Sequence, residues 1–126
     1  MPSEPLGILL ISGTHARAHY AFVLASGAGA LGRPVVLFAT NEGTRALLED
    51  WSELEDSGRD AAVRVRGVAG LGELREAAGQ LGVRMIACEA GLRMMGLEDA
   101  ERAQKTEVAG VTTFLEATRG GQIISL

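Results

Sequence analysis

The chain has 126 residues, of which 47% are hydrophobic, 22% charged and 4% aromatic, and this composition predicts one folded domain over residues 1–126. A net charge of -4 and a pI of about 5.2 argue against direct nucleic-acid binding, which requires a basic surface. The longest apolar stretch, residues 6–11, is far shorter than the roughly 20 residues that cross a bilayer, so we expect no membrane partner. We expect a cytoplasmic protein, in which a lone cysteine stays reduced.

Short apolar runs alternate with longer helical patterns along the chain. The pattern predicts strands at residues 6–11, 34–39, 83–87, 108–110 and 122–126. It predicts helices at residues 15–31, 44–51, 71–81, 89–95 and 111–118, with further helical turns over 97–105. Strands that alternate with helices imply parallel crossover units. The fold class is therefore a three-layer α/β/α arrangement around a mainly parallel sheet of four to six strands.

Residues 61–67 alternate apolar and basic side chains after a break at residues 57–60. The alternation is compatible with a short edge strand or with an exposed loop, and the sequence does not separate the two.

Cys88 is the only cysteine, and it lies where a predicted strand gives way to a short glycine-punctuated helix. A disulfide within one chain is excluded, which leaves a buried small hydrophobe, a metal ligand or a reactive thiol. The carboxyl ends of parallel strands gather ligands and chemistry, and free N–H groups at a helix start favour thiolate. Glu89 next to the thiol opposes this effect unless its side chain points to solvent.

His15 and His19 are four residues apart and would share one helix face. Two ligands are too few for a zinc site, so Cys88 or Glu42 would have to complete one. We prefer histidines that face solvent or substrate, and we expect no resident metal and no cofactor. By topology, we expect Gly13, His15 and Asn41 from neighbouring loops to line a pocket with Cys88, together with the adjoining Glu89.

Residues 27–32 match the string of the dinucleotide-binding motif G-x-G-x-x-G. That motif must follow a strand and open a helix, because the helix start holds the pyrophosphate. Here the string closes a helix, so we interpret it as a close-packing surface.

Residues 83–97 resemble the cysteine region of the DsrE/DsrF-like family, in which a strand ends in Ala-Cys and a short helix ends in Met-Gly and an aliphatic residue. Residues 9–13, 31–32, 67–74 and 111–115 also resemble that family. The resemblance thus extends over nearly the whole chain, with the cysteine region as its most specific part.

The resemblance implies a sulfur relay in which Cys88 accepts a persulfide sulfur and passes it on, as in a sulfurtransferase. It also implies sulfur donor and acceptor proteins of the rhodanese-like or sulfur-carrier type, and a homo-oligomer, either a trimer or a hexamer. Glu42-Gly43 departs from the aromatic or glycine-rich loops of many relatives. Two alternatives stay open: a noncatalytic oligomeric binding module, and a small-ligand or metal-binding protein that uses His15, His19 and Cys88.

Overall fold

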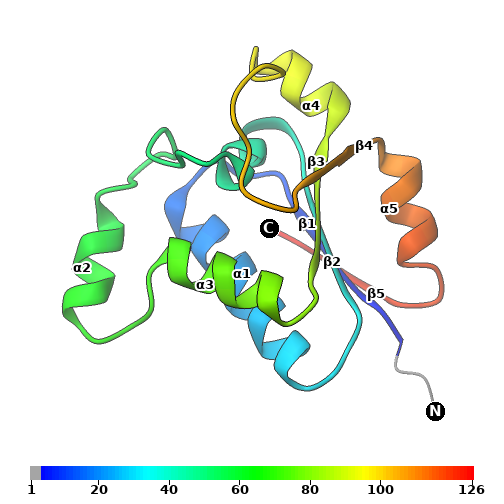
Figure 1. Ribbon diagram of the computed structural model, residues 1–126, viewed down its shortest axis with the longest axis horizontal. Coiled ribbons are helices and arrows are strands. Elements are labelled where there is room, and N and C mark those ends of the chain that lie inside the picture. The colour runs from blue at the N-terminus through cyan, green and yellow to red at the C-terminus, as the bar shows by residue number, and fades with distance from the viewer. Residues whose placement is uncertain (1–3) are drawn as a thin grey trace.

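The computed structural model describes residues 4–126 and contains one sheet of five strands, in which every neighbouring pair is parallel (Figure 1). The strand order is β4-β3-β2-β1-β5. The strands are β1 (Leu6–Leu10), β2 (Val35–Ala39), β3 (Arg84–Cys88), β4 (Glu107–Ala109) and β5 (Gln122–Ser125). The predicted parallel α/β sheet is confirmed.

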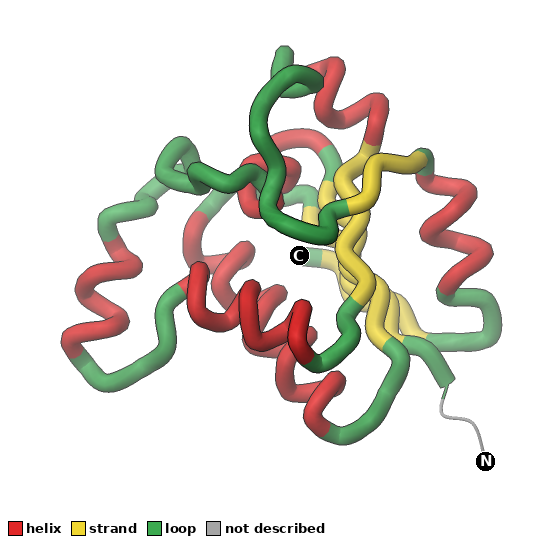
Figure 2. The backbone as a smooth tube through the Cα atoms, viewed as in Figure 1, coloured by secondary structure: helices red, strands yellow, loops and turns green. Residues whose placement is uncertain are grey.

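Helices cover both faces of this sheet (Figure 2). They are α1 (His15–Ala30), α2 (Arg59–Val65), α3 (Leu71–Gln80), α4 (Glu89–Met94) and α5 (Val111–Ala117), with a 3-10 helix, η1 (Asn41–Leu47). Helices α1 and α3 lie on one face, and α5 lies on the other. Among residues 4–126, no helix combines the length and the apolar character that a membrane crossing needs.

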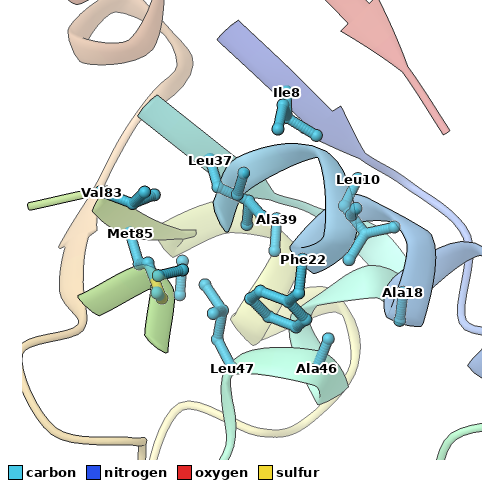
Figure 3. Close-up of a cluster of buried hydrophobic side chains, with 14 of the residues drawn as sticks. Ile8, Leu10, Ala18, Phe22, Leu37, Ala39, Ala46, Leu47, Val83 and Met85 are labelled. Carbon is cyan, nitrogen blue, oxygen red and sulfur yellow. The ribbon is translucent and has the colours of Figure 1, made fainter. Parts of the chain in front are cut away.

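The larger part of the core lies between the sheet and α1 (Figure 3). Ile8 and Leu10 point to this face because alternate residues of a strand share a side. They meet Ala18 and Phe22, which are four residues apart on α1 and so lie on one helix face. This burial of aliphatic and aromatic surface holds α1 against the sheet.

A smaller core lies on the opposite face, under α5. Phe114 of α5 stacks on Phe38 of β2, with ring centroids 5.1 Å apart. Ile86 and Cys88 of β3 belong to the same cluster. The single cysteine is therefore part of the apolar layer beneath α5.

Three local predictions are wrong. Residues 61–67, predicted as a strand or loop, lie mostly in α2, where the buried Asp60 supplies a tertiary anchor. The helix predicted from residue 44 is the 3-10 helix η1, which ends at Leu47. This helix starts at Asn41, and Gly43 within it packs so closely on the Leu10 carbonyl oxygen of β1 that a Cβ would not fit. Residues 97–105 form turns and one bridge rather than a helix.

Candidate functional site

Cys88 is the last residue of β3 and the N-cap residue of α4. Its backbone is extended, with φ -65° and ψ 121°, and the helix begins at the next residue. This geometry confirms the predicted position at a strand end and a helix start. The thiol thus lies at the carboxyl edge of the parallel sheet.

The Cys88 sulfur has one polar partner and an apolar surrounding. Its Sγ accepts a hydrogen bond from the backbone N–H of Gly91 at 3.3 Å. The residue is 7% exposed and packs in the cluster that contains Phe38 and Phe114. An N–H donor stabilises a thiolate, whereas the apolar layer excludes most water from it.

Gly91 allows α4 to start against the end of β2. A Cβ added at Gly91 would lie 2.8 Å from the backbone nitrogen of Asn41 and 3.0 Å from Oγ1 of Thr40. Any side chain at position 91 would push the first turn of α4 away from this segment. The backbone of Asn41, a predicted pocket residue, therefore lies next to the turn that holds the Cys88 sulfur.

Gly13 lies against the same segment from the other side. A Cβ at Gly13 would lie 2.7 Å from Cβ of Glu42, the residue after Asn41. The segments after β1, β2 and β3 therefore pack in a row at the carboxyl edge of the sheet.

The side chain of Glu89, predicted to line the pocket, is exposed to solvent. Its carboxylate lies 3.6 Å from Nη2 of Arg93, one helical turn later, and both side chains are mostly exposed. The negative charge next to Cys88 is therefore screened by solvent and partly balanced by Arg93.

His15 does not face the predicted pocket. It is fully buried on the α1 side of the sheet, where Nε2 lies 2.7 Å from Oδ1 of Asp60 and Nδ1 lies 3.2 Å from Nη1 of Arg59. None of its ring contacts reaches Cys88. The expectation that His15 lines a pocket with Cys88 is corrected: as the first residue of α1, it turns its ring into the body of the protein.

These contacts fix the orientation of the His15 ring. The Asp60 carboxylate only accepts, so Nε2–H of His15 donates to it, and Nδ1 faces the Arg59 guanidinium. Oδ1 of Asp60 also accepts the backbone N–H of Leu71 at 2.7 Å, which ties α1, α2 and α3 together.

Asp60 remains ionised in this setting. Burial opposes the charge and by itself raises the pKa of Asp60. The N–H of Leu71, the hydrogen bond from His15 and the nearby His15 and His19 rings outweigh burial and hold the pKa of Asp60 below its usual value.

His19 is also engaged within the fold. Its Nε2 donates to the carbonyl oxygen of Ala69 at 2.8 Å, and its ring stacks on His15 with centroids 5.4 Å apart. No group of three or more His, Cys, Asp or Glu side chains within residues 4–126 is arranged to hold a metal ion. A metal site built from His15, His19 and Cys88 is therefore not supported, because the histidines lie on the α1 side of the sheet and Cys88 lies under α5.

Two features of the site were missed from the sequence. The first is the place of Phe38 in the cluster with Cys88. Alternate residues of a strand share a face, and this pattern could have indicated that Phe38 of the neighbouring strand lies on the same face as Ile86 and Cys88. No local signal showed that Gly91 contacts Thr40 and Asn41, because that contact joins segments about 50 residues apart.

The model of the DsrE/DsrF/DrsH-like family matches residues 51–124, which is more than half of the chain and includes Cys88. The chain belongs to this family. The family is linked to sulfur relay. A comparison of the sequence with curated proteins finds no match.

Solved structures confirm the DsrE-like fold. The YchN protein of E. coli superposes with a TM-score of 0.75 at 11% sequence identity, over 98% of this chain and 99% of that one. MTH1491 of Methanobacterium thermoautotrophicum, described as a protein of unknown function, superposes with a TM-score of 0.65 at 20% identity, over 98% and 100% of the two chains. At these identities, the likeness shows the fold alone.

Proposed function

We propose that this protein is a sulfur carrier that accepts and passes on persulfide sulfur at Cys88. The observation that carries the proposal is the position of the only cysteine in a chain of this family. Cys88 lies at the carboxyl edge of the sheet, with the Gly91 N–H on its sulfur. The thiolate is the form that attacks sulfur, and the Gly91 N–H is a hydrogen-bond donor to the atom that carries it.

The proposed step balances without an outside oxidant. The Cys88 thiolate attacks the outer sulfur of a donor persulfide, a new sulfur–sulfur bond forms at Cys88, and the donor leaves as its thiolate. In the next step, an acceptor thiolate attacks the outer sulfur of the Cys88 persulfide, and the Cys88 thiolate is released. Because the chain has a single cysteine, no second thiol in the same chain can resolve the persulfide as a disulfide.

The partners of this reaction are a sulfur donor and a sulfur acceptor, of the rhodanese-like or sulfur-carrier type. We place the relay in the cytoplasm, where a lone thiol stays reduced, and in a homo-oligomer, a trimer or a hexamer. Exposed apolar side chains support self-association: Val111 and Leu115 lie one turn apart on α5, and both are about half exposed.

The test is intact-protein mass spectrometry after incubation with polysulfide. The wild type is expected to gain the mass of one sulfur atom, the gain is expected to reverse with reductant, and Cys88→Ser is expected to show no gain. An adduct on Cys88→Ser, or no adduct on the wild type, would contradict the proposal.

A noncatalytic binding module is the second candidate, and the low exposure of Cys88 favours it. In that case, Cys88 is a small apolar residue of the layer under α5. Native wild-type protein would then resist both polysulfide and an alkylating probe, and Cys88→Ser would leave assembly unchanged.

A further inference from the structure

Helix α2 stands apart from the layer formed by α1 and α3 (Figure 1). Its only buried residue is Asp60, whereas Val65 is 85% exposed and Val68, just after the helix, is 50% exposed. A short surface helix is normally held by an apolar face that packs on the core. Here the buried Asp60 holds the helix, and its aliphatic side chains remain uncovered.

We call residues 59–69 the arm. A shallow groove of about 700 Å³ lies along it, with Ala61, Val65 and Val68 as apolar lining. Arg64 and Glu73 lie at the groove as well, and their exposed side chains pair at 3.2 Å. Exposed pairs of this kind contribute little energy, so Arg64 can exchange its partner at small cost.

The arm and the segment before it carry opposite charges. Residues 59–66 contain three of the chain's 12 basic side chains, although the whole chain has a net charge of -4. The preceding segment, residues 49–56, contains five acidic residues, and all five are exposed: Glu49, Asp50, Glu53, Glu55 and Asp56. Among the residues that the structure describes, none of these five forms an ion pair with an arginine of the arm.

We propose that the arm is a contact between two copies of this chain, in which the two α2 helices pair antiparallel about a two-fold axis. A two-fold contact uses the same patch on both copies, so the patch must complement itself. The arm and the acidic segment before it meet this requirement together, because the exposed Ala61 and Ala62 lie between residues 49–56 on one side and Arg64 and Arg66 on the other.

The length of the helix determines which residues meet. Seven residues of α-helix span about 10 Å. Antiparallel pairing over that distance brings Arg64 and Arg66 of one copy next to the acidic residues that precede α2 in the other. The exposed aliphatic side chains then cover each other between the two charged contacts.

A second copy is favoured over an unrelated acidic protein because the chain itself supplies both halves of the contact. A stable interface buries about 800 Å² of surface on each partner, and a contact made by the arm alone is smaller, so it is weak by itself. Because its charged contacts are exposed, it is also sensitive to salt. The inference rests on the proposed function only in that both include self-association, and it does not depend on sulfur transfer at Cys88. A two-fold contact fits a hexamer rather than a closed trimer.

The test is the mass of the assembly, measured by sedimentation velocity over a range of protein and salt concentrations. Arg64→Glu/Arg66→Glu and Glu53→Arg/Glu55→Arg each create like charges across the contact, and each is expected to halve the mass seen for the wild type. An equimolar mixture of the two variants is expected to restore it, since each charge reversal then meets the other. Arg93→Glu/Arg119→Glu, with the same change in net charge on α4 and α5, is expected to leave the mass unchanged.

A wild type that is monomeric at every concentration would overturn the inference. So would an assembly whose mass neither arm variant changes, or variants that the mixture does not rescue. Circular dichroism of each variant confirms that the exposed substitutions leave the fold intact. Polysulfide loading of Cys88 in Arg64→Glu/Arg66→Glu is expected to match the wild type, so a failure of the arm contact and a failure of the sulfur-carrier proposal give different results.

Discussion

His15 Nε2 donates to Asp60 Oδ1 across 2.7 Å and joins the first residue of α1 to the second residue of α2. The same carboxylate oxygen accepts the N–H of Leu71 at the start of α3. One buried side chain therefore fixes three helices relative to one another.

Asp60→Ala is expected to lower the free energy of unfolding by about 2 kcal/mol, because it leaves the N–H groups of His15 and Leu71 buried without an acceptor. Urea denaturation followed by circular dichroism measures the loss. Asp99→Ala removes a carboxylate that is exposed and is the control. Equal losses in the two variants would mean that the buried contact does not hold α2.

The stability that Asp60 contributes is expected to depend on pH. Its pKa is depressed in the folded protein, so the contribution is fully present above the unfolded pKa of about 4 and is lost as the pH falls through the lower folded value. The difference in unfolding free energy between the wild type and Asp60→Asn should therefore shrink as the pH falls below about 4. A difference that stays constant over this range would show that the charge of Asp60 does not contribute.

Gly91→Ala is expected to destabilise the fold by about 1–3 kcal/mol, because the new Cβ would lie 2.8 Å from the backbone nitrogen of Asn41. Gly79→Ala is the matched control. Nothing lies within 4 Å of a Cβ at that position in α3, so it should stabilise the protein by about 0.5–1 kcal/mol. Thermal or urea unfolding of both variants checks the sign. Equal effects would mean that the contact between α4 and the segment after β2 is loose.

Phe114→Ala is expected to raise the rate at which an alkylating probe reacts with Cys88 in native buffer. Phe114 is buried in the same cluster as Cys88, and its loss opens the layer under α5. Phe22→Ala deletes a buried ring from the other core and should cost a similar 3–5 kcal/mol. If both variants raise the alkylation rate equally, global unfolding rather than the cover of α5 controls access to the thiol.

The sequence predicts the strands and most of the helices well because their signals are local. The apolar run at residues 83–87 marks β3, and the shift to a glycine-punctuated segment marks the start of α4 at Glu89. These two signals place Cys88 at the carboxyl edge of the sheet without knowledge of any contact.

The prediction of α2 is wrong because its pattern is ambiguous. Alternating apolar and basic residues suit a strand, but two consecutive alanines also favour a helix. The choice depends on Asp60, whose partners His15 and Leu71 lie 45 positions before it and 11 positions after it.

The amino-acid sequence by itself determined the parallel α/β class, the strand that carries Cys88 and the family resemblance, because periodicity and short motifs act within a few residues. Only the tertiary structure decided that His15 turns away from Cys88 toward Asp60, and that Gly91 contacts Asn41. Such contacts join segments distant in the chain, and hydrogen bonding and close packing between those segments select them.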